Sequence, residues 1–315
     1  MPIRPNFLII GAMKCGTTSL YELFRQHPEI GMSTEKEPAF FAADDAFARG
    51  WGWYESLFAP VADRPARGEA STSYSKRFRF PRAADRIARH LPDVKLIYVV
   101  RDPLERIESQ WMHGVHQGWH DGRFERGLED PGLVDPSRYW AQISAYRRYF
   151  ADEQMLVLFF DDFKADPRRF LERCFQFIGV NSSFVPEGLC QRRNTSETHQ
   201  SDAPVLKALR RLPTFSTAVR VLPEHWRAAI RRRWFTRGAC GRPAWSEDLR
   251  RKVLWQISDD IRTFLYFYGK PLDHWDLGES DTAESFSLAS QPALPIRSPL
   301  GFLPLPQSPD AMSLG

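Results

Sequence analysis

Three short runs of mostly apolar residues stand out in the first half of the chain. They lie at 7–10, 95–100 and 155–160, and the second is β-branched at three of its six positions. Short runs that are apolar at consecutive positions are typical of strands buried on both faces of a parallel sheet. The pattern therefore predicts a parallel strand at each of these positions.

A helical pattern follows each run. The first begins near Thr17 and has one apolar face, made of Leu20, Leu23 and Phe24. The second extends from Leu104 to about His116, and the third opens at Pro167. Strands that alternate with helices predict an α/β fold, a P-loop-like three-layer architecture with a central, mainly parallel sheet flanked by helices. Ligands in such folds bind beyond the carboxyl ends of the strands.

The chain beyond residue 200 has a different pattern. Residues 205–270 read as helices with basic surfaces, for which a solvated helix face is the simplest explanation. From Gly278 onward the chain is rich in Ser and Pro and has a single basic residue, Arg297. A segment of this composition buries too little apolar surface to fold. We therefore predict one domain over 1–277 and a disordered tail over 278–315.

Composition narrows the class of protein. The net charge of +4 suits an anionic ligand, although a solvated basic face is the commoner cause, and it does not favour nucleic acid as a partner. The four Cys form no CxxC pair and show no zinc-ligand spacing. The chain opens without an apolar signal segment and has no run of about 20 apolar residues. We therefore expect a reduced, cytoplasmic protein without a transmembrane segment.

The strongest local signal is the segment GAMKCGTTS, from Gly11 to Ser19. A glycine-containing turn between a strand and a helix aims backbone amides and the helix dipole at one point. Lys14 adds a full positive charge, and Thr17, Thr18 and Ser19 add hydroxyl donors. The segment predicts a phosphate-binding loop; the alternative is an ordinary turn with Thr as a helix cap.

This loop differs from the nucleoside-triphosphate pattern GxxxxGK[ST]. Gly11 and Gly16 have the spacing of that pattern, but residue 17 is Thr where the pattern has Lys. The lysine of the loop is instead Lys14, two residues before the second glycine. An anhydride shorter than a triphosphate, which needs no metal ion, fits this loop better.

Four segments together resemble PAPS-dependent sulfotransferases (PAPS is 3′-phosphoadenylyl sulfate), including the Golgi heparan-sulfate type and many bacterial members. They are PNFLIIGAMKCGTTSLYELFRQHPEI from Pro5, EKEPAFF at 35–41, GEASTSY at 68–74 and VRDPLERIES at 100–109. The similarity extends from about Asn6 to Trp275. It implies that Arg101 and Ser109 bind the 3′-phosphate of PAPS. It also implies that the 5′-phosphosulfate is held by Lys14, Cys15, Gly16, Thr17, Thr18 and Ser19.

The resemblance also implies catalytic roles and an acceptor class. Lys14 is expected to neutralise charge on the bridging oxygen as 3′,5′-ADP leaves, with no metal ion. Glu37 matches the base of the glycan-type members, whereas Glu35 is two residues away. The cytosolic branch uses His instead, which makes His113 or His116 the alternative base. The expected acceptor is a hydroxyl, or alternatively an amine, of a glycan, glycolipid or small molecule, and its identity and the oligomeric state stay open.

Further positions resemble the acceptor side of the family. Glu69 and Tyr74 match a segment that borders the acceptor site, but Ala70 stands where many glycan-type enzymes have lysine, which weakens the case for an anionic polysaccharide. Three aromatic residues that follow the proposed base lie close together in the sequence: Trp51, Trp53 and Tyr54. They could form an aromatic wall of the acceptor site, or they could pack in the core. A late loop that closes over the nucleotide could be formed by Arg192, Arg193 and Asn194.

Two other classes of protein stay open at this point. The position of Lys14 argues against a nucleotide kinase or NTPase. Such an enzyme also needs a carboxylate that binds Mg²⁺, and Asp161-Asp162 is the sole candidate in the sequence. A non-catalytic protein that binds anions or nucleic acid is suggested by the basic residues between 227 and 242. Finally, the start of the helix after the loop predicts a lowered pKa for the thiol of Cys15, which we otherwise interpret as a small spacer.

Overall fold

A computed structural model describes residues 2–189 and 241–278 of the chain. Within these residues, five strands form one sheet in which every pairing is parallel, in the order β2-β3-β1-β4-β5. The predicted parallel sheet is confirmed, as are its strands at 7–10, 95–100 and 155–160. The strands are β1 (Phe7–Gly11), β2 (Ile30–Met32), β3 (Ala66–Ala70), β4 (Lys95–Val100) and β5 (Met155–Phe159).

Strands β2 and β3 were not predicted, and their sequences show why. β2 is only three residues long, and β3 reads ARGEA, with an arginine and a glutamate among its five residues. Glu69 is nevertheless buried in β3. Gly68 is required beside it, because a Cβ at this position would lie 2.3 Å from the ring of Phe7 on β1.

The helices follow the strands as the sequence pattern predicts. Three of them, α5 (Pro103–Gln117), α7 (Pro131–Val134) and α10 (Pro167–Ile178), begin with a proline that is preceded by a capping aspartate. Asp102 accepts a hydrogen bond from the amide of Glu105 at 2.8 Å, and Asp166 accepts one from the amide of Arg169 at 2.9 Å. The described helices are α1 (Thr17–Phe24), α2 (Asp44–Phe47), α3 (Gly50–Ser56), α4 (Ala83–His90), α5 (Pro103–Gln117), α6 (Phe124–Gly127), α7 (Pro131–Val134), α8 (Tyr139–Arg147), α9 (Phe160–Ala165), α10 (Pro167–Ile178) and α14 (Glu247–Phe267).

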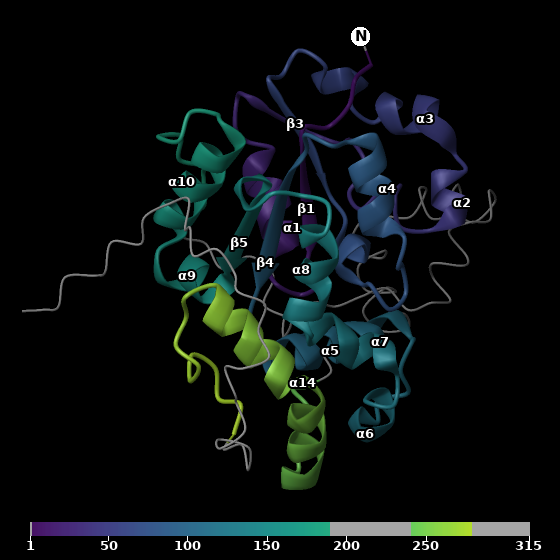
Figure 1. Ribbon diagram of the computed structural model, residues 1–315, viewed down its shortest axis with the longest axis vertical. Coiled ribbons are helices and arrows are strands. Elements are labelled where there is room, and N and C mark those ends of the chain that lie inside the picture. The colour runs from purple at the N-terminus through teal and green to yellow at the C-terminus, as the bar shows by residue number, and fades with distance from the viewer. Residues whose placement is uncertain (1, 190–240, 279–315) are drawn as a thin grey trace, which may run out of the picture. The chain divides into compact units, whose positions relative to one another are not determined.

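Helices cover both faces of the sheet. Figure 1 shows α4 and α8 in front of the strands. On the opposite face, α1 packs against α10 through Phe24 and Phe175, whose ring centroids are 5.5 Å apart. The late helix α14 packs along α8, where Asp260 accepts hydrogen bonds from the amides of Trp140 and Ala141 at 2.9 and 2.8 Å. This arrangement is the predicted three-layer α/β fold.

The predictions for the later part of the chain are tested only in part. The helical character expected over 205–270 is confirmed for α14, and residues 205–240 lie outside the described residues. The tail predicted over 278–315 likewise lies outside them, except for Gly278. No helix within 2–189 or 241–278 is both long enough and apolar enough to cross a bilayer.

Candidate active site

The loop after β1 is a closed turn at the edge of the sheet where all five parallel strands end. Within it, the amide of Ala12 donates to the carbonyl of Val99 at 2.7 Å, and the amide of Cys15 donates to the carbonyl of Ala12 at 3.2 Å. Gly16 has a φ of +83°. A Cβ at Gly16 would lie 2.5 Å from the ring of Phe160, so the loop requires glycine here.

The first turn of α1 faces this loop with free amides. The amides of Thr17, Thr18 and Ser19 lie at the start of the helix, before the first amide that donates to a helical carbonyl. None of the three therefore donates within the helix. Such amides and the positive end of the helix dipole attract anions. The amide of Cys15, in contrast, is already bonded within the loop. The predicted phosphate loop therefore has its amide donors in the first turn of α1.

Lys14 and Arg101 come together from the ends of β1 and β4. The guanidinium of Arg101 donates from Nη1 to the backbone carbonyl of Lys14 over 3.2 Å. Burial lowers the pKa of Lys14, and the charges of Arg101 and Lys36 lower it further. Cations that are held together in a partly buried place attract an anionic ligand.

Arg101 is anchored on one side and has an unused donor on the other. Its Nη2 atom forms an ion pair with Glu105 on α5, whereas the neighbouring Asp102 caps the helix. The Nε atom of Arg101 is buried and has no hydrogen-bond partner among the described residues. A buried donor without a partner costs free energy unless a ligand accepts from it. Ser109 lies farther along α5 and is buried.

Glu37 lies in the loop after β2, at the same edge of the sheet. Its carboxylate accepts a hydrogen bond from the hydroxyl of Thr72 at 3.2 Å and pairs with Lys36 at 3.1 Å. The charge of Glu37 raises the pKa of Lys14, which burial lowers, so the two groups are electrostatic neighbours. Glu35, two residues earlier, is exposed. The structure thus brings together the predicted base and the predicted cation.

The two histidines considered as alternative bases lie on α5. The ring of His113 lies 5.4 Å from that of Trp119, between centroids, and His116 is buried. At 1.5 Å per residue they lie about 15 and 20 Å along the helix from its start at Pro103. Only the start of α5 lies at the strand ends, so Glu37 is better placed for catalysis.

The sequence matches a family described as the sulfotransferase domain over residues 4–212. The matched part contains the loop after β1, the Glu37 turn and the end of β4 with Arg101. The chain belongs to the sulfotransferase family. The resemblance expected from the four motifs is therefore confirmed.

Two human relatives of this sulfotransferase are named for heparan sulfate. Human heparan sulfate glucosamine 3-O-sulfotransferase 3B1 is 32% identical over 186 residues, which cover 56% of this chain and 46% of that protein. The human bifunctional heparan sulfate N-deacetylase/N-sulfotransferase 3 is 28% identical over 197 residues, which cover 56% of this chain and 22% of that protein. The chain thus spans about half the length of the first relative and less of the second.

A solved structure has the same fold over most of the chain. The sulfotransferase from Alicyclobacillus acidocaldarius superposes with a TM-score of 0.62 at 25% sequence identity. The superposition covers 86% of this chain and 98% of that one. The P-loop-like α/β fold predicted from the sequence is therefore the fold of this sulfotransferase.

One expectation about the site is wrong. Cys15 is buried, and this burial raises the pKa of its thiol to about 11 instead of lowering it. Desolvation outweighs the helix dipole because the thiol is in the core beneath the loop.

Of the two interpretations of the aromatic segment after Glu37, core packing applies to Tyr54. Its side chain is buried and stacks on Phe40 with 4.4 Å between ring centroids. Trp51, which is partly buried, also packs against Phe40, at 5.4 Å between ring centroids.

Sequence reasoning missed Lys76, which follows the short helix η2 (Thr72–Ser75). Its ammonium nitrogen lies 3.0 Å from the sulfur of Met13, the residue before Lys14. Burial lowers the pKa of Lys76 to about 8, although the charge of Glu37 raises it. Lys76 could have been predicted if the Glu69 segment had been recognised as a strand that ends at the site, because Lys76 follows that strand by only a few residues.

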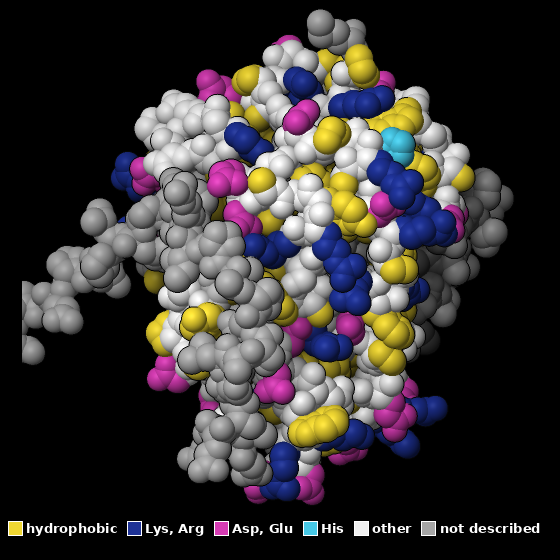
Figure 2. Space-filling view, in the orientation of Figure 1, with side chains coloured by type: hydrophobic (Ala, Val, Ile, Leu, Met, Phe, Trp, Pro, Cys, Tyr) yellow, Lys and Arg dark blue, Asp and Glu magenta, His cyan; other side chains and the backbone are white. Residues whose placement is uncertain are grey.

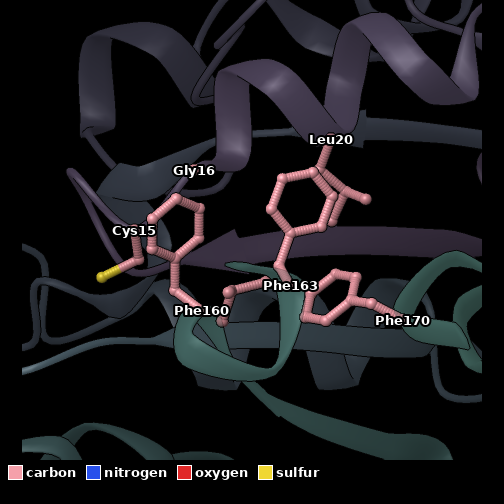
Figure 3. Close-up of a pocket in the computed structure, with 7 residues that line it drawn as sticks. Cys15, Gly16, Leu20, Phe160, Phe163 and Phe170 are labelled. Atoms are coloured by element: carbon pink, nitrogen blue, oxygen red, sulfur yellow. The ribbon is translucent and has the colours of Figure 1, made fainter. Parts of the chain in front are cut away.

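A small apolar pocket lies beneath the loop. Figure 3 shows the ring of Phe160 beside Cys15 and Gly16, and the ring of Phe163 beside Leu20. Its remaining lining residues are Leu20, Val99 and Phe170. The volume of about 10 Å³ is at the lower limit for a single water molecule. The pocket therefore reflects packing of the loop on α9 and is too small for a nucleotide.

The structure also bears on the alternatives to a sulfotransferase. Asp161 accepts a hydrogen bond from the indole of Trp275 at 3.0 Å, and Asp162 pairs with Lys270 at 3.1 Å. No group of three His, Cys, Asp or Glu side chains in the described ranges is arranged to hold a metal ion. On the face seen in Figure 2, Lys and Arg side chains are interspersed with Asp and Glu. The late-loop residues Arg192, Arg193 and Asn194 and the basic residues 227–240 lie outside the described residues.

Proposed function

We propose that this chain moves a sulfuryl group from PAPS to a hydroxyl of a glycan, glycolipid or small-molecule acceptor, and releases 3′,5′-ADP; an amine is the alternative nucleophile. The observation that carries the proposal is the junction of Lys14 and Arg101, which share a hydrogen bond of 3.2 Å at the ends of β1 and β4. A nucleotide with anionic groups on its 5′ and 3′ oxygens can engage both cations at once.

The donor site fits such a nucleotide. The amides of the first turn of α1, the hydroxyls of Thr17 to Ser19 and the ammonium of Lys14 would hold the 5′-phosphosulfate. Arg101 would hold the 3′-phosphate, because its buried Nε atom still lacks an acceptor. Ser109 is the second donor that we assign to this phosphate. A cytoplasmic location for the protein stays a prediction from the sequence.

The chemistry needs little beyond position and charge. The acceptor oxygen forms a bond to sulfur while the bond from sulfur to the bridging oxygen breaks, and the electrons of that bond stay on the 5′-phosphate. Lys14 stabilises this charge, as cations do in phosphoryl transfer. Glu37 takes the proton of the acceptor hydroxyl, which makes it a competent nucleophile. The carboxylate of Glu37 is held by Thr72 and remains 38% exposed, so an acceptor can reach it.

The acceptor class is supported by the relatives and limited by one residue. The names of both human relatives give heparan sulfate as the substrate. In this chain Ala70 follows Glu69, where many glycan-type enzymes have a lysine. We therefore keep neutral glycans, glycolipids and small hydroxylated molecules beside the anionic polysaccharides.

Incubation of the full chain with ³⁵S-labelled PAPS and an acceptor panel tests the proposal. The panel contains heparan sulfate, neutral oligosaccharides, glycolipids and a metabolite extract. We expect a labelled product and stoichiometric 3′,5′-ADP, insensitive to a chelator. Glu37→Gln should abolish labelling and His116→Ala should not. Hydrolysis of ATP in place of PAPS turnover would overturn the proposed donor. Loss of labelling with the chelator would overturn the reaction without a metal ion. Normal labelling by Glu37→Gln would overturn the assigned base.

A further inference from the structure

Glu69 is a fully buried carboxylate on β3 that accepts hydrogen bonds from three hydroxyl groups. Tyr54 and Tyr74 donate to its Oε1 atom at 2.7 and 2.6 Å. Ser71 donates to its Oε2 atom. A buried carboxylate that collects three donors orders all of them, because each hydroxyl must keep its hydrogen directed at the carboxylate.

Two of these three hydroxyls in turn hold the loop that carries Glu37. The Ser71 hydroxyl oxygen accepts a hydrogen bond from the amide of Ala39 at 2.9 Å. The Tyr74 hydroxyl oxygen accepts one from the amide of Phe41 at 3.4 Å. Each hydroxyl can accept from the loop in this orientation because its own hydrogen points at Glu69. A continuous hydrogen-bonded path therefore joins Glu69 to the backbone just after Glu37.

The loop needs this external support. Glu37 and Ala39 both have positive φ, +56° and +52°, a conformation that residues other than glycine seldom adopt. The amide of Glu37 donates to the carbonyl of Ala70, directly after Glu69, at 3.2 Å. Its carboxylate accepts from Thr72 in the same segment. The strained turn is thus fastened to residues 70–74 at several points, two of which depend on Glu69.

We infer that Glu69 is a positioning residue, which sets the place of the Glu37 carboxylate through Ser71 and Tyr74. This inference rests on the proposed function, since it concerns the base of that reaction. Tyr54 does not belong to the path, because its hydroxyl bonds Glu69 while its ring stacks on Phe40 in the core. Tyr54 therefore offers a matched control.

Protonation of Glu69 should break the path. Burial raises the pKa of Glu69 to about 7, although the hydroxyl donors lower it. The groups that face it are Tyr54 from α3, Ser71 and Tyr74 from the segment after β3, Tyr146 from α8 and the charge of Glu37. A proton added to the Glu69 carboxylate points at a hydroxyl oxygen whose own hydrogen already points at Glu69. When the proton points at Ser71 or Tyr74, that hydroxyl must rotate, and it loses its orientation toward the Glu37 loop.

The test compares four variants of the full chain, with PAPS and the acceptor that the panel labels best. We expect Glu69→Gln, Ser71→Ala and Tyr74→Phe each to lower kcat by about tenfold or more, with KM for PAPS within about threefold of wild type. Tyr54→Phe should keep kcat within about threefold of wild type. The wild-type kcat should fall as the pH drops through about 7, and Glu69→Gln should lack this step.

Several outcomes would overturn the inference. It fails if Tyr54→Phe lowers kcat as much as Ser71→Ala, or if Glu69→Gln has the wild-type kcat and pH profile. Thermal melting shows which variants fold; if Glu69→Gln does not, the contrast between Ser71→Ala and Tyr54→Phe decides. Glu37→Gln is measured in parallel. An inactive Glu37→Gln beside a normal Glu69→Gln overturns this inference alone, whereas a fully active Glu37→Gln overturns the proposed base and this inference with it.

Discussion

The guanidinium of Arg101 donates a hydrogen bond to the backbone carbonyl of Lys14 over 3.2 Å, although the two residues lie 87 positions apart. The bond connects the segments that follow β1 and β4, which are neighbours in the sheet. It joins the Lys14 loop to Arg101, whose buried Nε atom has no hydrogen-bond partner among the described residues. The donor site that we propose for this sulfotransferase is organised around this pair.

Replacement of Lys14 should stop the reaction. We expect Lys14→Ala to lower kcat by more than tenfold, because the leaving oxygen then loses the cation that stabilises its charge. Lys252→Ala is the control, since Lys252 is an exposed lysine on α14. Turnover is measured with ³⁵S-labelled PAPS. A Lys14→Ala variant that keeps a tenth of the normal kcat would refute the assigned role.

Replacement of Arg101 should weaken donor binding more than chemistry. We expect Arg101→Ala to raise the Kd of 3′,5′-ADP by about tenfold or more, because a charge-assisted contact to a phosphate is lost. At saturating PAPS, kcat should change less. Isothermal titration measures the Kd. Arg89→Ala serves as the control, because Arg89 is exposed and pairs with Asp85 on its own helix. Equal binding by Arg101→Ala and wild type would contradict the assignment.

Lys76 should contribute a charge that is lost at alkaline pH. Burial lowers the pKa of Lys76 to about 8, so its ammonium form disappears as the pH rises through that value. We expect Lys76→Met to lower kcat/KM at pH 7, and the difference from wild type to shrink by pH 9. Arg79→Met, an exposed neighbour, should match wild type at both values. An undiminished difference at pH 9 would show that packing, not charge, explains the effect.

Cys15 should resist alkylation in the folded protein. Burial raises the pKa of its thiol from 9.0 to about 11, so the reactive thiolate is about 100-fold rarer than in an exposed cysteine at the same pH. Iodoacetamide at pH 8, followed by mass spectrometry of the Cys15 peptide, measures this. Labelling should become fast in concentrated urea. Rapid labelling of the folded chain would instead support the lowered pKa that the helix start suggests.

Glu69 should make stability depend on pH. Its pKa in the folded chain, about 7, lies above the ordinary value of 4.5, so the folded state binds the proton more tightly than the unfolded state. The free energy of unfolding should therefore decrease as the pH rises from about 4.5 to about 7, by up to about 3 kcal/mol. Denaturant titration of wild type and Glu69→Gln at pH 5 and pH 8 measures the difference. A difference that does not depend on pH would contradict the raised pKa.

The phosphate loop could be predicted from the sequence because its signal is local. Strand β1, the glycine turn and the start of α1 are contiguous, and each has a characteristic pattern over a few residues. The helix starts at Pro103 and Pro167 are local in the same way, since a proline and the preceding aspartate suffice to define them. The roles of Glu37 and Arg101 came from family motifs and not from local physics.

The sequence by itself determined the alternation of strands and helices, the phosphate loop and the family. Only the tertiary structure decided which groups are buried and which meet: that polar β3 enters the sheet, that Cys15 faces the core, and that Lys76 lies beside Met13. The physical reason is range. Periodicity and turn chemistry act over a few residues, whereas desolvation and hydrogen bonding depend on neighbours that the folded chain brings from tens of positions away.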